Sequence, residues 1–262
     1  MRSIHYRVLG PIEVIDDNGH PVIPPSTMVR GLLAALLAEP GRTVAIHRLI
    51  DALWNEPPDS AESNLRGYVT RLRRTLPAGI AQQLITRRGA GAGNGGGYGL
   101  RIHDGECDVD AFRRLMATGR GLAAAEQYQA AATAMRDAVQ LWRGPAGDDL
   151  PDTWPLRTLA AGLNDERLAA VEDLAATDLL LGHGHTATSE LTALVASEPT
   201  RERAWALLAQ ARHLTTGRAA GIRTIEHARS VLTTAIGPHR QVHLDRANQA
   251  IAEGNSRPTV SV

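Results

Sequence analysis

The chain has 262 residues, no net charge and one cysteine. This length allows one large domain or two ordinary ones, each with its own core. A single cysteine excludes an intrachain disulfide, a cysteine-rich zinc site and an iron–sulfur site, and the first residues lack the apolar core of a signal peptide. No apolar run approaches the length of a membrane span, so we expect a soluble, cytoplasmic, nucleoid-associated protein with no membrane partner.

Charge divides the chain into two halves. Residues 1–102 carry 12 arginines against 8 acids, a net charge of +4, whereas residues 103–262 carry 16 arginines against 20 acids, a net charge of −4. All 28 cations are arginines. A basic half followed by an acidic half favours one part that binds nucleic acid and one that binds protein.

The first half begins with strand signals. Short strands are expected at residues 4–9, 12–15 and 21–23, with a turn at residues 16–19. Ser26 or Thr27 can cap a helix that Pro40 stops, a second helix covers residues 46–54, and Ser60 can cap a third that extends to residue 76. Residues 84–88 and 98–102 then form a hairpin. This order predicts an α+β winged helix with an extra N-terminal sheet.

The positive charge of the first half is concentrated in the third helix and the hairpin. From residue 60 to residue 102 there are seven arginines against Glu62 alone, a net charge of +6, which favours a bound polyanion over a merely solvated face. On the helix, apolar side chains recur at helical spacing and predict one buried stripe, made of Leu65, Tyr68, Val69, Leu72 and Leu76. The opposite face is polar and basic.

Side chains on the exposed face of such a helix can read base edges in the major groove, and flanking cations hold phosphates. The candidates for base reading are Asn64, Gly67, Thr70, Arg71 and Arg74. The candidates for phosphate contacts are Arg66 and Arg73 beside that face and Arg87 and Arg88 at the base of the hairpin.

The second half reads as helical throughout. Helices are expected at residues 108–119, 123–142, 154–182, 186–196, 201–214, 218–236 and 240–252. From residue 179 onwards a helix, a short Gly or Pro turn and a second helix repeat, as in all-α tetratricopeptide-like hairpins. We therefore expect a winged-helix domain at residues 1–102, a helical domain at 103–253 and a disordered tail at 254–262.

Other motifs favour structural over chemical roles. Residues 91–96 satisfy G-x-G-x-x-G, but a strand rather than a helix follows, so a flexible hairpin tip is favoured over a dinucleotide site. His183-Gly184-His185 lies at a turn without further ligands, and Cys107 has no basic partner. Trp142, Trp154 and Trp205 are expected to pack between helices. We expect no enzyme activity, no cofactor and no metal.

Six segments in order along the chain resemble the Streptomyces antibiotic regulatory protein family of actinobacterial transcription activators. They are residues 8–14 (VLGPIEV), 48–54 (RLIDALW), 68–76 (YVTRLRRTL), 107–112 (CDVDAF), 141–146 (LWRGPA) and 198–202 (EPTRE). The chain departs from the family pattern in three places. The hairpin tip at residues 89–97 is a long glycine run where the family has a tight turn. An aromatic residue common in the family is replaced around Arg212-His213, and the segment after residue 237 is shortened.

The resemblance implies an OmpR/PhoB-type winged helix joined to a bacterial transcriptional activation domain, in the small form of the family. It also implies binding to direct repeats in double-stranded DNA beside a promoter, usually as a side-by-side dimer. The bound protein would recruit RNA polymerase holoenzyme, through the sigma factor, the alpha C-terminal domain or the beta flap, to antibiotic or secondary-metabolite genes. Candidates for the polymerase contact are Arg30, Arg42, Trp54, Glu56 and Asp59.

A different function is consistent with the same residues. The helical half can belong to an adaptor that binds a protein or a small ligand while the basic half only anchors it to DNA. An adaptor would bind its partner without raising transcription, whereas an activator would raise it.

Overall fold

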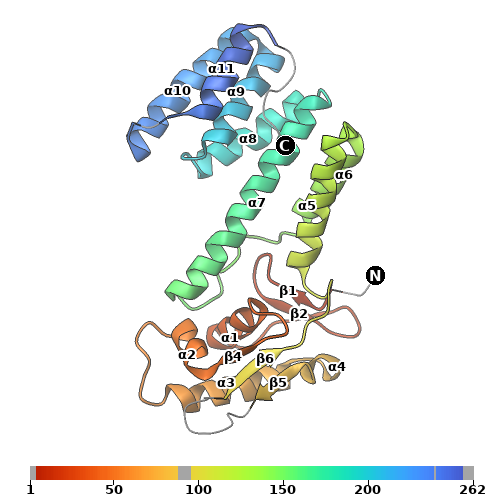
Figure 1. The fold of residues 1–262 in the computed structure, drawn as a ribbon, viewed down its shortest axis with the longest axis vertical. Coiled ribbons are helices and arrows are strands. Elements are labelled where there is room, and N and C mark those ends of the chain that lie inside the picture. The colour runs from red at the N-terminus through yellow and green to blue at the C-terminus, as the bar shows by residue number, and fades with distance from the viewer. Residues whose placement is uncertain (1–3, 88–95, 239, 256–262) are drawn as a thin grey trace. The chain divides into compact units, whose positions relative to one another are not determined.

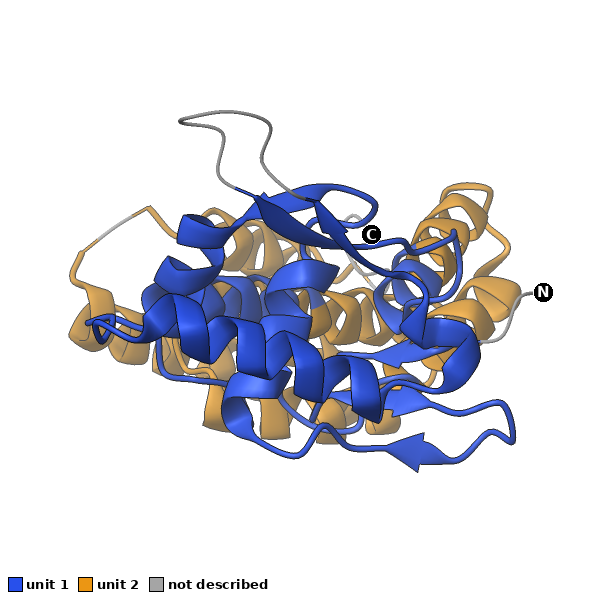
Figure 2. Cartoon of the chain, turned by 90° about the horizontal axis from the view of Figure 1, so that it is seen from below, with its two compact units in different colours: residues 1–113, 141–166 blue, residues 114–140, 167–262 orange. Residues whose placement is uncertain are grey.

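The structure, a computed structural model, describes residues 4–87, 96–238 and 240–255. Helices and strands are labelled in Figure 1. The chain forms two compact units, shown in different colours in Figure 2: unit 1 comprises residues 1–113 and 141–166, and unit 2 comprises residues 114–140 and 167–262. Helices α5 (Asp108–Ala124) and α7 (Trp154–Leu180) contribute residues to both units.

Unit 1 begins with the expected antiparallel sheet, made of β1 (Tyr6–Arg7), β2 (Glu13–Ile15) and β3 (Pro21–Val22) in that order. The turn before β3 places Gly19 at a φ of +84°, where a side chain would be strained. The Asp16 carboxylate accepts hydrogen bonds from the backbone N–H groups of Asn18 and His20 at 2.9 and 2.7 Å. The three predicted strands are therefore confirmed, although each is shorter than expected.

Three helices follow: α1 (Thr27–Leu37), α2 (Ile46–Leu53) and α3 (Ala61–Thr75). Ser26 is the cap of α1, since its hydroxyl accepts a hydrogen bond from the Val29 N–H at 3.3 Å. The helices enclose one apolar core, and its fully buried leucines include Leu32, Leu36, Leu49, Leu53, Leu65 and Leu72. Burial of such side chains is worth about 1.5–3 kcal/mol each and is what orients α3.

A second sheet completes the winged helix. Its strands β4 (Thr43–Ala45), β6 (Gly97–Leu100) and β5 (Leu84–Arg87) pair in that order. The hairpin was predicted, whereas β4 and the short helix α4 (Ala78–Ala81) were not. A Cβ atom on Gly97 would come within 2.3 Å of the Val44 carbonyl oxygen, and one on Gly99 within 2.5 Å of the Arg42 oxygen. These two glycines thus allow β4 to lie against β6.

Unit 1 continues beyond the winged helix because segments distant in sequence meet there. The buried Asp108 carboxylate accepts hydrogen bonds from the N–H groups of Val8 and Leu9, at 2.9 and 3.1 Å. Arg143 donates its backbone N–H to the Leu9 carbonyl and forms ion pairs with Glu13 and Asp108, at 3.1 and 3.6 Å. Three of the six segments that carry the family resemblance therefore form one cluster.

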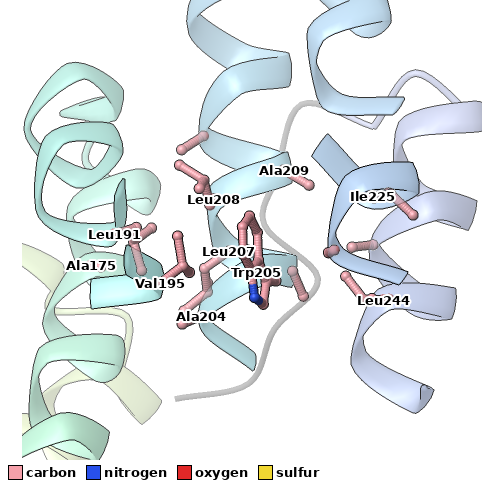
Figure 3. Packing of buried hydrophobic residues seen from close by; sticks show 14 of the residues in the cluster. Ala175, Leu191, Val195, Ala204, Trp205, Leu207, Leu208, Ala209, Ile225 and Leu244 are labelled. Atoms are coloured by element: carbon pink, nitrogen blue, oxygen red, sulfur yellow. The ribbon is translucent and has the colours of Figure 1, made fainter. Parts of the chain in front are cut away.

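Unit 2 contains α6 (Tyr128–Gln140), α8 (Gly184–Ser197), α9 (Glu202–Thr216), α10 (Arg218–Ile236) and α11 (Val242–Ala252), together with parts of α5 and α7. Helix α9 lies in the middle of the C-terminal helices and packs against α8, α10 and α11 (Figure 3). Its residues from Ala204 to Ala209 are buried, with Trp205 donating its indole N–H to the Pro199 carbonyl at 2.9 Å. The repeated helical hairpins predicted from sequence are confirmed.

Charged groups hold unit 2 together as well. The Asp173 side chain is 5% exposed and pairs with Arg203 at 2.6 Å and with Arg120 at 2.7 Å. Asp178, 1% exposed, pairs with Arg136 at 3.3 Å. Acids on α7 thereby bind cations from α5, α6 and α9.

The tryptophans of the helical half differ in burial. Trp142 and Trp205 are buried, but Trp154 is 69% exposed, so the prediction that it packs between helices is wrong. It is the first residue of α7, at the end of the helix, where fewer neighbours are available to cover a side chain. Among the described residues, no helix is long and apolar enough to cross a membrane. The predicted tail falls mostly on residues 256–262, outside the described residues.

Candidate nucleic-acid interface

Helix α3 presents one apolar and one polar face, as predicted. Leu65, Val69 and Leu72 are buried, and α1 and α2 pack against the helix. The mean hydropathy of the helix is low because the other positions carry charged or small polar side chains. Burial of the leucine stripe therefore leaves the arginine-rich face of α3 exposed.

The base-reading candidates mostly lie on that exposed face. Gly67, Thr70, Arg71 and Arg74 are exposed, and Asn64 is half-buried. Thr70 donates its hydroxyl hydrogen to the Arg66 carbonyl at 3.0 Å, which leaves its oxygen able to accept. The structure thus brings all five candidates onto one helix, spaced over three turns.

The start of α3 differs from expectation. Ser60 is the residue before the helix, but its side chain makes no capping hydrogen bond to the backbone. Its hydroxyl oxygen instead accepts a hydrogen bond from the Asn64 side-chain amide at 3.1 Å. Because Ser60 has a φ of −85° and a ψ of 8°, rather than extended values, its side chain is not placed to cap the helix.

The candidates for phosphate contacts differ in their exposure and in their partners within the protein. Arg66 pairs with Glu62 one turn earlier, and Arg87 is exposed on β5. Arg73 donates to the Leu84 carbonyl and to the Thr86 hydroxyl, both at 3.2 Å, so its guanidinium links α3 to the hairpin. Arg88 lies outside the described residues, as do most of the residues of the glycine-rich motif at 91–96.

An aromatic contact supports the arginine face and was not foreseen from the sequence. Trp54, directly after α2, stacks on Tyr68 of α3 with ring centroids 5.9 Å apart and an angle of 26°. The Arg71 guanidinium carbon lies 6.0 Å from the Tyr68 ring centroid, at the outer limit of a cation–π contact. Tyr68 therefore lies between the Trp54 ring, on which it stacks, and a weak cation–π contact with Arg71 in this part of α3. The only sequence signal was an aromatic residue at the edge of the apolar stripe.

Gly67 is an interior helix position with no packing reason to be glycine. A Cβ atom built there would meet no atom of the described residues within 4 Å. Glycine inside a helix costs about 0.5–1 kcal/mol relative to alanine, so the protein itself would be more stable with alanine. The absence of a side chain leaves the α3 backbone accessible at the centre of the arginine-rich face.

The polymerase-contact candidates fall into two groups. Arg42 is 81% exposed, Glu56 and Asp59 are exposed in the α2–α3 connection, and Trp54 is half-buried by its stacking. Arg30 is only 18% exposed, because it forms an ion pair with Asp149 at 2.9 Å and donates to the Pro24 carbonyl. The positive charge of Arg30 is therefore paired with a carboxylate within unit 1.

The remaining chemical motifs have structural partners. His183 lies with its Nδ1 atom 3.2 Å from a carboxylate oxygen of Asp178. Cys107 is buried, and desolvation, aided by the nearby Asp108 charge, raises the pKa of its thiol to about 12. A thiol with so high a pKa is protonated at neutral pH and is a poor nucleophile.

Comparison with known proteins identifies both parts of the chain. The family described as "Bacterial transcriptional activator domain" matches residues 107–252, and the family described as "Transcriptional regulatory protein, C terminal" matches residues 21–91. The solved structure of "Mycobacterium tuberculosis EmbR in complex with low affinity phosphopeptide" superimposes with a TM-score of 0.84 at 27% identity, covering 100% of this chain and 67% of that one.

Individual relatives are similar over most of the chain. The "Regulatory protein DnrI" of Streptomyces peucetius is 30% identical over 250 residues, which cover 93% of this chain and 90% of DnrI. The "Transcriptional regulatory protein EmbR" of Mycobacterium tuberculosis is 30% identical over 238 residues, 90% of this chain and 60% of EmbR. The "Regulatory protein AfsR" of Streptomyces coelicolor is 31% identical over 255 residues, 97% of this chain but only 24% of AfsR.

The chain thus spans about 60% of the length of EmbR and nearly the whole of DnrI. The relatives named above are regulatory proteins by name, and the two matching families lie in the same order as the winged helix and the helical hairpins. The chain therefore belongs to the Streptomyces antibiotic regulatory protein family of transcriptional regulators.

Proposed function

We propose that the protein activates transcription by binding direct repeats beside a promoter through α3 and by recruiting RNA polymerase holoenzyme. The regulated genes would be an antibiotic or other secondary-metabolite cluster. The observation that carries the proposal is the exposed face of α3, where Arg71 and Arg74 follow Gly67 about one and two helical turns later and all three residues are exposed. A helix of this kind fits the major groove, where arginine pairs with guanine.

Each candidate has a defined role in this proposal. Arg71 and Arg74, with Asn64 and Thr70, read base edges, and Gly67 lets the helix backbone approach them closely. Arg66 and Arg87, together with Arg88, hold phosphates. Arg73 acts on the phosphates indirectly, because its bonds to β5 fix the hairpin against α3.

Selection from random DNA tests binding and identifies the operator in the same experiment. The full chain is used to select duplexes from a random pool, and the selected duplex is then footprinted. Two protected blocks on one face of the duplex, separated by about one helical turn or a multiple of it, are expected for a side-by-side pair. A single protected block would contradict paired binding.

Activation requires a second surface that stays available while DNA is held. Arg42, Glu56 and Asp59 are the exposed candidates, Trp54 shapes the same connection, and Arg30 contributes through its bond to Asp149. Polymerase contact by this region distinguishes an activator from the adaptor considered above. An adaptor would hold a partner on DNA without increasing transcription.

The Glu56→Arg, Asp59→Arg double variant tests the polymerase contact. We expect it to bind the selected duplex as the wild type does but to lose most activation in a promoter-reporter strain, because the charge of the α2–α3 connection is reversed. Asp137→Arg, at an exposed position of α6, is the matched control and should activate normally. Full activation by the double variant would exclude this surface.

A further inference from the structure

Unit 1 contains a pocket of about 190 Å³ that none of the functions above uses. Its walls come from the end of α1, from the first turns of α5 and from residues 146–163, and all of them belong to unit 1. Most of the lining side chains are aliphatic, among them Val109, Leu159 and Leu163. The pocket is therefore a site for an apolar body rather than for a hydrated ion.

Two charged residues of α5 line the pocket, and they differ in how they are paired. Arg113 is neutralised by a two-point interaction with Glu166, in which its Nε donates at 2.9 Å and its terminal nitrogen at 2.7 Å. The Asp110 carboxylate has no side-chain hydrogen bond or ion pair within the described part of the chain. The pKa of the Arg113 guanidinium is raised by Glu166 and, to a lesser degree, by the Asp110 charge. The pocket thus offers a half-buried carboxylate near that paired arginine, and this carboxylate accepts no hydrogen bond from the described residues.

We propose that this pocket binds a small amphipathic molecule, consisting of one ring or a short branched hydrocarbon with an ammonium or hydroxyl group that donates to Asp110. The size fits such a ligand, since an apolar cavity of about 150 Å³ in another protein accepts benzene. The aliphatic walls favour the apolar body, and the carboxylate favours a donor. An anionic ligand of the same shape is disfavoured because it would face Asp110.

The position of the pocket gives the ligand a structural consequence. Leu37 is the last residue of α1 in the winged helix and Ala38 follows it, whereas Cys107 and Ala160 belong to the part that matches the activation domain. A ligand that contacts both sets stabilises unit 1 by mass action. This inference is independent of the proposed function, because binding can be measured without DNA or polymerase.

Three probes of equal shape test the proposal on the full chain: benzylamine, benzyl alcohol and benzoate. Calorimetric titration should show saturable binding of benzylamine and of benzyl alcohol, with benzylamine the tighter, and at least tenfold weaker binding of benzoate. Asp110→Asn should remove the preference for benzylamine over benzyl alcohol. No saturation by benzylamine at millimolar concentration, or equal binding of benzoate, would overturn the proposal.

A pair of neighbouring substitutions locates the site. Ala160→Leu places three extra carbons in the pocket and should weaken benzylamine binding at least tenfold, whereas Ala161→Leu, at the next and exposed position of α7, should leave it unchanged. Unchanged binding in Ala160→Leu would place the probe elsewhere.

Cys107, the only cysteine of the chain, lines the pocket and gives a measurement that needs no variant. Benzylamine at saturation should slow its alkylation several-fold, and an unchanged rate would also contradict the site.

Discussion

Some residues of α3 have a structural role within the fold, and others are explained only by the proposed binding to DNA. Gly67 is the clearest case, since no atom in the described part of the chain lies within 4 Å of the position its Cβ would take, and the helix would be more stable with alanine. Arg73 is the opposite case, because its guanidinium is already bonded to β5. The sequence predicted base reading for Gly67 and a phosphate contact for Arg73, but it gave no sign of the bonds from Arg73 to a hairpin more than ten residues away.

Gly67→Ala should change stability and DNA binding in opposite directions. We expect the free energy of unfolding to rise by about 0.5–1 kcal/mol, while affinity for the selected duplex falls because the new methyl group obstructs close approach. Gly162→Ala is the matched control, as it is also an exposed helix position where a Cβ meets no atom within 4 Å. It should show the stability gain alone, and a loss of affinity in both variants would argue against a special role for Gly67.

Cys107 gives a prediction about pH. Burial raises the pKa of its thiol from 9.0 to about 12, so the folded state favours the neutral form. The stability contributed by this group is complete below pH 9 and is lost as pH rises towards 12. At pH 8 alkylation should be at least about a hundredfold slower in the folded protein than in urea, since only the thiolate reacts. Equal rates would show that the thiol is accessible and normally acidic.

At the scale of elements, long periodic helices were predicted well and short pieces poorly. Helix α10 was expected at its observed bounds, because Gly217 and Gly237 terminate it on both sides. Strand β4 has three residues and no alternation to detect, and it exists only because Gly97 and Gly99 leave room beside β6. Non-local packing of this kind leaves no signal within the strand itself.

The buried ion pairs of α7 should contribute to the stability of unit 2. Asp173→Ala should lower the free energy of unfolding by about 1.5–3 kcal/mol, because it removes a buried acceptor shared by two arginines, although Arg203 keeps Glu172 as a partner at 3.4 Å. Asp137→Ala, an exposed acid on α6, should change it by no more than about 0.5 kcal/mol. Urea unfolding of both variants measures the difference. Similar values for the two would mean that the network adds little to stability.

At the scale of the whole molecule, the opposite charges of the two halves predicted two functional parts, and the two family matches follow the same order. The compact units divide the chain differently, because residues 141–166 join the winged helix in unit 1. That join depends on Asp108 and Arg143, which bond to the backbone of residues 8–9 about a hundred or more residues earlier in the chain. The division into domains at residue 102 remains a prediction.

We propose that the arginine-rich face of α3 reads DNA, and the salt dependence of DNA binding by Arg74→Ala is the sharpest test of that role. Arg74 is preferred to Arg71, which also contacts Tyr68. We predict a loss of about 1–3 kcal/mol in affinity for the selected duplex, with a smaller loss on unrelated DNA. Arg218→Ala, an exposed arginine of α10, is the control and should bind as the wild type does. If Arg74→Ala bound the selected duplex with wild-type affinity and wild-type salt dependence, α3 would not be the reading helix.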